Sequence, residues 1–170
     1  MNIVLSTCIL RPWQRGDEES LSRHANDREV WRNLRDVFPH PYTLEDAREW
    51  VRHARGVSPP SDFAIVVDGA AVGGIGLVVQ PDIFRRSAEV GFWVGRAYWG
   101  RGIATEALAA FAEYAFATYD LVRLYAGVIE WNAASGRVLE KAGFTLEGRL
   151  RKAVTKDGQT ADELLYALVR

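Results

Sequence analysis

The chain has 170 residues, 48% of them hydrophobic, and its 21 Lys and Arg residues nearly balance its 22 Asp and Glu residues. This length and composition suit a single domain, residues 1–170, with a well-filled core. The net charge of −1 is not the basic excess of a nucleic-acid-binding protein, so no nucleic-acid partner is expected.

The chain also lacks the signals of a disulfide scaffold, a metal protein or a membrane protein. A single cysteine, Cys8, excludes an internal disulfide, and three histidines without ligand spacing give no reason to expect a metal. No charged-then-apolar leader begins the chain, and no apolar run reaches the roughly 18 residues that a membrane span needs. We therefore expect a cytoplasmic protein with no membrane partner.

The first half of the chain mixes strand and helix signals. Thr43 and Asp46 imitate a capping box at the start of a helix. Asp68-Gly69, between two apolar runs, is a strong hairpin signal. The predicted elements, in order, are a strand over Val4–Arg11, helices over Asp17–Ala25, Arg28–Leu34 and Thr43 to about Arg55, and strands over Phe63–Val67 and Val72–Val79.

The second half is organised around residues 88–108. Ala88–Val94 alternates as a strand, and from Ile103 onward the apolar spacing becomes helical. The elements predicted after this helix are a strand over Val122–Glu130, a helix that Asn132 caps and Gly143 ends, and a hairpin of Phe144–Lys152 and Thr160–Val169 that turns at Asp157-Gly158. This order favours an α+β fold with a mixed, mostly antiparallel sheet flanked by helices, in which the two strands around the long helix lie parallel.

The junction between the central strand and the long helix is suited to an anion. The first N–H groups of a helix have no internal partners, and the helix dipole leaves partial positive charge there. Gly100 and Gly102 would let phosphates approach these groups, and Arg101 adds a full positive charge. The alternative is that the glycines only make a tight turn. The residues after Gly102 do not match a P-loop, and Thr105 does not match a dinucleotide-binding fingerprint.

The run Trp99-Gly100-Arg101-Gly102-Ile103-Ala104 resembles the acyl-CoA loop of the GNAT N-acetyltransferase superfamily. AEVGFWV followed by YWGRGIATEAL is similar to the RimJ/RimL-like branch, in which a Trp recurs in place of the usual Arg or Gln of this loop. The resemblance covers nearly the whole chain and is most specific over residues 88–144. It implies the GNAT fold, in which the parallel strand pair splays apart at the CoA site, and acetyl-CoA as the co-substrate.

The resemblance also implies which residues contact acetyl-CoA. The backbone of Phe92–Val94 is similar to the segment that pairs with the pantetheine arm and donates an N–H to the thioester carbonyl. Asn132 and Ser135 belong to a run that is similar to the second cofactor motif of the family. The expected contacts are Phe92, Trp93, Val94, Trp99, Gly100, Arg101, Gly102, Ile103, Ala104, Thr105, Asn132, Ser135 and Leu139.

Acyl transfer from a thioester to an amine needs a group that takes the proton of the amine. A second group that protonates the departing thiolate assists the reaction. Glu89 is the candidate base, because several families of the superfamily place a catalytic Glu at this point of the central strand. The alternative is a solvated carboxylate. Many relatives have a Tyr acid where Leu139 stands, so Ser135 is the candidate acid, as in RimL-like members, with an ordinary helix residue as the alternative. The Glu of RimL-like enzymes on the penultimate strand aligns with Val154, which favours Glu89 as the base.

In this branch the first helices and the loop before the central strand wall the acceptor cleft. Trp31, Tyr42 and Phe84 are therefore the expected acceptor contacts, with a place in the core as the alternative for each. The predicted function is an N-acetyltransferase that moves an acetyl group directly from CoA to a primary amine of a protein N-terminus or a small molecule. A non-catalytic CoA-binding regulatory module is the alternative, and a nucleotide-binding protein of another class is a more distant one. Dimers are common in this branch, so a homodimer is one of the expected oligomeric states.

Overall fold

A single sheet of eight strands organises the fold, as seen in a computed structural model that describes residues 1–170. The strand order across the sheet is β1-β2-β3-β4-β5-β6-β8-β7. All neighbours are antiparallel except β5 and β6, which run parallel. The predicted α+β class with a mixed, mostly antiparallel sheet is confirmed. None of the helices is long and apolar enough to cross a membrane.

The elements follow the chain in the predicted alternation. The strands are β1 (Ile3–Val4), β2 (Ile9–Pro12), β3 (Asp62–Val67), β4 (Ala70–Val79), β5 (Ser87–Val94), β6 (Arg123–Ile129), β7 (Thr145–Lys156) and β8 (Gln159–Val169). The helices are α1 (Glu18–Ala25), α2 (Arg28–Trp31), α3 (Leu44–Arg55), α4 (Ile103–Thr118) and α5 (Ala133–Lys141), and two short 3₁₀ helices are η1 (Asp82–Phe84) and η2 (Arg96–Tyr98).

The first predicted strand, Val4–Arg11, is wrong as a single element. β1 and β2 are separate short strands that pair with one another in antiparallel fashion. The turn between them forms because Ser6 and Thr7 donate backbone and hydroxyl hydrogen bonds to the Glu106 carboxylate in the first turn of α4. The partner that breaks the strand thus lies about 100 residues away along the chain, where no local pattern reveals it.

Other local signals predicted their elements well. The capping box at the start of α3 is present, with Thr43 and Asp46 exchanging both hydrogen bonds. Asp68 and Gly69 both adopt positive φ in the turn between β3 and β4. The predicted helix over Arg28–Leu34 is shorter than expected, since α2 ends at Trp31 and the side chains beyond it serve as long-range contacts.

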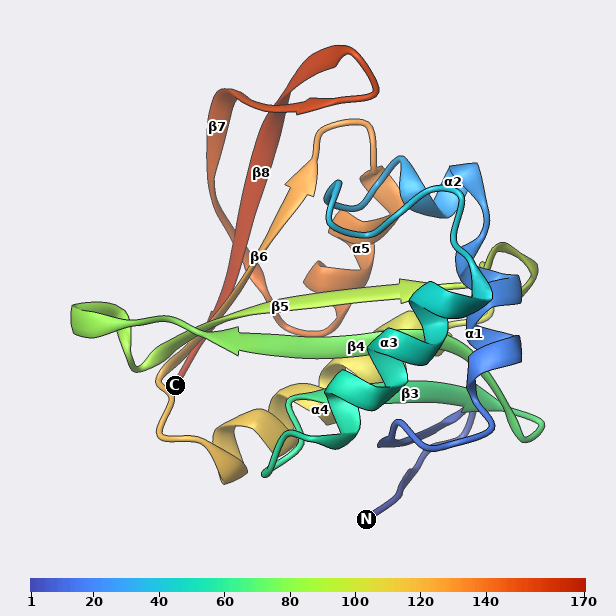
Figure 1. The fold of residues 1–170 in the computed structure, drawn as a ribbon. Coiled ribbons are helices and arrows are strands. Elements are labelled where there is room, and N and C mark those ends of the chain that lie inside the picture. The colour runs from blue at the N-terminus through green and yellow to red at the C-terminus, as the bar shows by residue number, and fades with distance from the viewer.

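Helices cover both faces of the sheet, and each face has its own core (Figure 1). α4 packs its apolar stripe on one face, where the buried side chains are Ile103, Ala107, Leu108, Phe111, Ala112 and Ala115. α1 and α3 pack on the opposite face over a smaller core. Burial of these two apolar surfaces holds the central strands rigidly between the layers.

β5 and β6 pair over only three positions before they separate. Ser87, Ala88 and Glu89 pair with Arg123, Leu124 and Tyr125, respectively. β5 then continues to Val94 and β6 to Ile129 with no further pairing between them, while β6 stays paired with β8. Figure 1 shows β6, β7 and β8 turning away from β5 beyond this point. The expected splay of the parallel pair is therefore present in the fold.

Candidate active site

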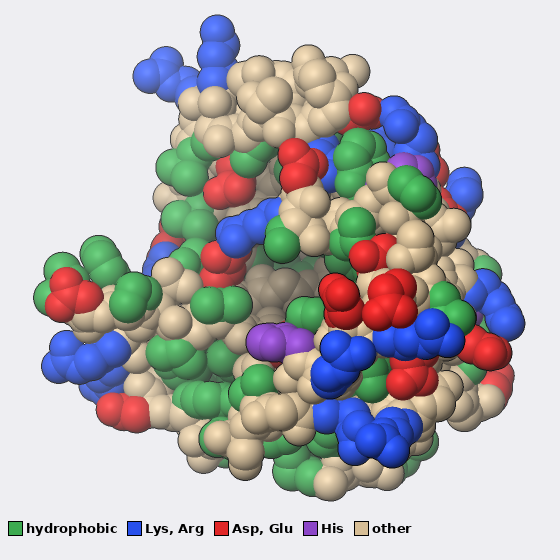
Figure 2. Space-filling view, in the orientation of Figure 1, with side chains coloured by type: hydrophobic (Ala, Val, Ile, Leu, Met, Phe, Trp, Pro, Cys, Tyr) green, Lys and Arg blue, Asp and Glu red, His purple; other side chains and the backbone are tan.

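A cavity of about 1000 Å³ opens where β5 and β6 separate. Its walls come from α3, the N-terminus of α4, α5 and residues 32–43 between α2 and α3, which we call the roof loop. Figure 2 shows the hollow on this face of the molecule, with acidic side chains on its margins. The predicted site residues that line it are Tyr42, Glu89, Phe92, Trp93, Val94, Trp99, Gly100, Arg101, Gly102, Ile103, Ala104, Thr105, Asn132, Ser135 and Leu139.

The loop before α4 presents a series of free backbone donors to this cavity. Gly100 and Gly102 have φ of +73° and +76°, a conformation that favours glycine, and a Cβ on either would meet nothing within 4 Å. The N–H groups from Gly100 to Thr105 donate no hydrogen bond within the chain, because the first helical bond of α4 runs from Glu106 N to Gly102 O. Unpaired N–H groups at a helix N-terminus attract phosphate. The loop therefore fits a pyrophosphate.

The side chains of the same loop hold it in place. The Trp99 indole N–H donates to the Val94 carbonyl at 2.7 Å, which ties the loop to the end of β5. Arg101 donates to the Ala97 carbonyl and lies 5.0 Å from the ring centre of Tyr98. The indole contact of Trp99 fastens the loop to the backbone of the neighbouring strand. Trp99 does this at the position where the acyl-CoA loop that it resembles usually has Arg or Gln.

The free edge of β5 lies between this loop and α5. Phe92 packs toward the core under α4, and Trp93 packs toward the core under α1 and α3. The backbone of this segment faces the gap left by β6, so its unpaired groups can add an extended ligand by strand-like hydrogen bonding.

α5 brings a hydroxyl group to the other side of the gap. Asn132 caps this helix by accepting a hydrogen bond from the Ser135 backbone N–H, and its side-chain amide donates to Ser135 Oγ at 2.9 Å. Because Oγ already accepts this bond, the hydroxyl proton is free to point elsewhere. Ser135 is half-buried and lines the cavity. Leu139, one turn further along, is fully buried and closes the wall behind it.

Glu89 lies at the point where the parallel strands part. Its side chain is 25% exposed and forms an ion pair with Arg35 of the roof loop. Arg35 was not anticipated from the sequence, because the two residues are 54 positions apart and no local signal links them. Glu89 thus lines the cavity with a carboxylate, a group that can accept a proton.

Two of the three predicted acceptor contacts do not line the cavity. Trp31 instead packs on the β7–β8 hairpin, where the buried ammonium of Lys156 lies 3.7 Å from its ring centre. Phe84 lies in η1 beyond the end of the β4–β5 pairing, with 62% of its surface exposed. Tyr42 lines the cavity and is also buried in the core under α1 and α3, where desolvation raises the pKa of its hydroxyl. Its contact with an acceptor stays a prediction.

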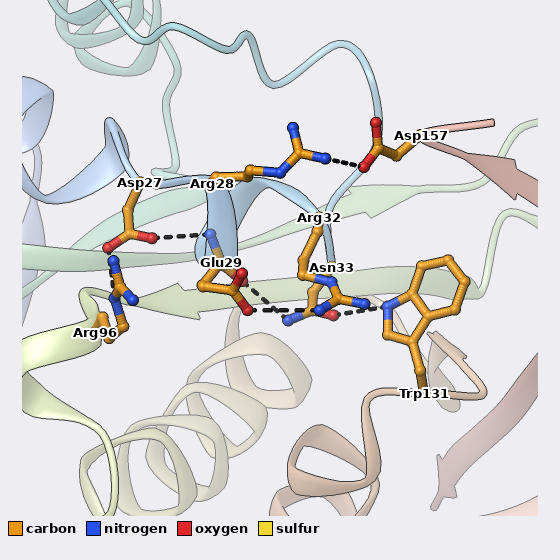
Figure 3. A network of polar contacts seen from close by, with 8 residues as sticks. All are labelled: Asp27, Arg28, Glu29, Arg32, Asn33, Arg96, Trp131 and Asp157. Carbon is orange, nitrogen blue, oxygen red and sulfur yellow. Dashed lines mark hydrogen bonds and ion pairs between the residues drawn. The ribbon is translucent and has the colours of Figure 1, made fainter. Parts of the chain in front are cut away.

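The roof loop is anchored through α2 to three distant segments (Figure 3). The anchoring contacts are those of Asp27 with Arg96 in η2, of Arg28 with Asp157 in the β7–β8 turn, and of Asn33 with Trp131 before α5. Lys156 adds a fourth contact, an ion pair with Asp36 of the roof loop at 2.7 Å. The roof is therefore held over the gap by the same elements that surround it.

The half of the cavity between the roof loop, α3 and the sheet contains functional candidates that the sequence did not reveal. They are the aromatic side chains Trp13, Phe38 and Trp50 and the carboxylate Asp62. Burial raises the pKa of the Asp62 carboxyl, while a hydrogen bond from Ser61 acts in the opposite direction. One usable signal was present: Gly74, Gly76 and Gly91 occupy one face of β4 and β5. The space above Gly91 is open, and side chains of the cavity wall fill the space above the other two glycines.

Comparison with known proteins agrees with this geometry. The family model for the acetyltransferase (GNAT) domain matches residues 8–145. The probable N-acetyltransferase YjcK of Bacillus subtilis is 29% identical over 170 residues, which cover 96% of this chain and 94% of that protein. The spermidine N(1)-acetyltransferase of Escherichia coli K12 is 30% identical over 152 residues, covering 88% of this chain and 79% of that protein.

A solved structure shows the same fold. RimJ of Mycobacterium smegmatis in complex with CoA-disulfide superposes with a TM-score of 0.83 and 29% identity, covering 95% of this chain and 81% of that chain. The family match spans most of the chain and includes the loop with free N–H groups, the divided strands and the whole of α5. The chain belongs to the GNAT family of acetyltransferases, and it is an acyltransferase.

Proposed function

We propose that the protein transfers an acetyl group from acetyl-CoA to a primary amine, by direct attack while both substrates are bound. One observation carries this proposal: a single cavity joins the free N–H groups of the α4 loop, the open edge of β5, the Ser135 hydroxyl and the Glu89 carboxylate. A site that holds donor and acceptor together needs no covalent intermediate on the protein.

The residues present fit acetyl-CoA as the co-substrate. The loop from Gly100 to Thr105 would bind the pyrophosphate, and the open edge of β5 over Phe92–Val94 would pair with the pantetheine arm. A backbone N–H of this edge would donate to the thioester carbonyl, where negative charge develops. The thioester supplies an activated acyl group and a thiolate that leaves readily; everything else is supplied by side chains and backbone of this chain.

Glu89 and Ser135 take the two proton-transfer roles. An amine attacks only when it is neutral, and Glu89 would accept its proton, directly or through one water. For this, Arg35 must share the carboxylate with the incoming amine or move aside from it. Ser135 would donate its hydroxyl proton to the thiolate, with its oxygen held by the Asn132 amide.

The acceptor is a small-molecule amine or a protein N-terminus. A panel of both kinds, incubated with acetyl-CoA and read through release of the free CoA thiol, tests the proposal. Acetylation of at least one class, with mass-spectrometric detection of the amide, supports it. CoA binding without transfer to any amine would instead favour a regulatory CoA-binding module. This alternative is supported by Leu139, where many relatives have a Tyr acid, and by Val154, where RimL-like enzymes have a Glu.

A homodimer is a further part of this proposal. Exposed apolar side chains gather at the turn between β4 and β5, where Val78, Ile83 and Phe84 are all more than 60% exposed. Such side chains are typical of a surface covered in an assembly. Analytical ultracentrifugation of the wild type and of Phe84→Ser decides the point: a dimer that dissociates on this change supports it, and a monomeric wild type rejects it.

A further inference from the structure

The acceptor half of the cavity has a floor without side chains. Gly76 of β4 and Gly91 of β5 lie directly opposite one another in the register, on the face that carries Glu89. A Cβ at Gly91 would meet nothing within 4 Å, so the space above it is open. This floor continues from the point where the amine would react toward β3, which allows an acceptor to extend across the sheet.

Asp62 occupies the far end of this floor. It is paired in register with Gly76, and a Cβ at Gly76 would lie only 2.0 Å from Asp62 Oδ1. The carboxylate therefore lies over the glycine instead of pointing away from the sheet. Glycine at position 76 is what makes this arrangement possible, since any other residue would push the carboxylate aside.

The Asp62 carboxylate is half-buried and only partly satisfied. Oδ2 accepts a hydrogen bond from the Ser61 hydroxyl at 2.6 Å, whereas Oδ1 accepts none from the chain. Asp62 belongs to none of the ion pairs of the structure, and the basic side chain that influences its carboxyl is the imidazole of His53. Glu89, by contrast, has Arg35. A partly desolvated carboxylate that no Lys or Arg of the chain pairs with is well placed to bind a cation.

Aromatic side chains line the cavity that contains this carboxylate. They include Trp13, Trp50 and Trp93, and the ring centres of Trp93 and Phe38 are 5.6 Å apart. Aromatic faces attract ammonium groups, and the methylene groups of an alkylamine pack against the ring edges. Of the other carboxylates that line the cavity, Asp46 is already engaged in the capping box of α3 and Glu49 is exposed on α3, so Asp62 is the half-buried carboxylate on the floor.

We infer that Asp62 binds a second cationic group of the acceptor, so that the preferred acceptors are diamines rather than monoamines. This inference rests on the proposed function for the amine that reacts, at Glu89. Two strand spacings and a shift of two residues along β5 place the Cα atoms of Asp62 and Glu89 about 12 Å apart. Because the Asp62 carboxylate reaches over Gly76 toward β5, a diamine with a few methylene groups would span the glycine floor between this carboxylate and Glu89.

The test compares n-alkylamines with α,ω-diaminoalkanes of the same chain length. For the wild type, kcat/KM should be higher for the diamine of each pair. Asp62→Asn should lower kcat/KM for diamines about tenfold or more, through KM, and leave the monoamines unchanged, because a hydrogen bond to a charged group is lost. Gly76→Ala, which displaces the carboxylate, should reproduce this selective loss. Asp120→Asn, the same substitution on an exposed residue outside the cavity, should change neither.

A binding measurement keeps the inference separate from the proposed function. Diaminobutane should raise the Tm of the wild-type complex with CoA more than n-butylamine does, and Asp62→Asn should abolish the difference. If no amine is acetylated but this difference is present and lost in the variant, the proposed function fails and the Asp62 site stands. The Asp62 site would be overturned by two results together. Asp62→Asn would change kcat/KM for both amine classes equally or for neither, and diaminobutane and n-butylamine would raise the Tm of the wild type equally.

Discussion

The two halves of the cavity are built from different parts of the protein. The CoA half consists mainly of backbone: a continuous stretch from β5 through the α4 loop, in which the ligand would meet N–H groups and a strand edge. The acceptor half consists of side chains from β3, the roof loop, α3 and β5, which are far apart along the chain. Backbone donors are the same in every sequence that adopts this path, whereas side chains can be exchanged one at a time. The first half therefore suits a constant substrate and the second a variable one.

The largest expected effect comes from the point where the halves meet. Glu89→Gln should lower kcat about 10²- to 10⁴-fold, the usual contribution of a positioned base, while CoA binding stays unchanged. The loss should shrink as the pH rises, since more of the acceptor amine then arrives neutral. Steady-state kinetics against pH measure this.

A matched control for Glu89 lies on the same face of the sheet. Glu163 of β8 places its carboxylate next to Gly127 of β6, but it does not line the cavity. Glu163→Gln should leave turnover near the wild-type value. Equal losses for the two variants, or near-normal turnover of Glu89→Gln at pH 7, would remove Glu89 from the mechanism.

Ser135→Ala should have the next largest effect. Turnover should fall roughly 10²-fold, at the lower end for proton transfer because a thiolate leaves readily, with little change in CoA affinity. Asn132→Asp sharpens the test, because it can still cap α5 but no longer donates to Ser135 Oγ, so part of the same loss is expected. If CoA affinity fell as much as turnover, Ser135 would be only a cofactor contact.

CoA binding should be lost when the conformation of the loop before α4 is changed. Gly102→Val should remove the stabilisation by CoA, which for the wild type is about 2.7 kcal/mol at 100 times the dissociation constant. Gly158→Val is the matched control, because Gly158 in the β7–β8 turn has a similar φ of +74° and equally open surroundings. Both variants introduce the same backbone strain, and only Gly102→Val should lose the CoA-induced rise in Tm. A full rise in Gly102→Val would place the pyrophosphate elsewhere.

The smallest effect should be on stability alone. Hydrogen bonds from Ser6 and Thr7 lower the pKa of Glu106 to about 2, so its ionised form stabilises the fold above the ordinary pKa near 4.5, and this contribution is lost as the pH falls toward 2. Glu106→Gln should cost on the order of 1 kcal/mol at pH 7, given its solvent exposure, and the gap in Tm should narrow as the pH falls from 4.5 toward 2. A gap that is independent of pH would mean that the carboxylate charge is not involved.

The contrast between the halves also explains what the sequence could predict. Gly100, Gly102 and Asn132 act through local geometry, so their spacing and a family resemblance were sufficient to place them at the cavity. The acceptor contacts depend on how distant elements meet. Trp31 and Phe84 were expected there because they belong to the segments that wall the acceptor cleft in this branch. In the structure, Trp31 packs on Lys156 outside the cavity, and Phe84 lies at the end of the β4–β5 hairpin, away from the cavity.

The long-range partners were beyond prediction for the same reason. Arg35 reaches Glu89 across 54 positions, and Glu106 divides the first strand from about 100 positions away. Pairing of this kind follows from tertiary packing, which leaves no periodic trace in a single sequence. The splay of β5 and β6 was expected from the family alone, because alternation of apolar residues predicts strands and says nothing of where their pairing stops.

The separation of β5 from β6 also has a consequence for solubility. Unpaired strand edges recruit other chains and promote aggregation, and most proteins protect the outer edges of their sheets for this reason. Here two unpaired edges, over residues 90–94 of β5 and 126–129 of β6, lie within the sheet and face one another. The roof loop and α5 flank the gap, so a foreign strand cannot dock along it as it would on an outer edge. The fold can thus keep an unpaired strand edge permanently available to a ligand without exposing it to other chains in solution.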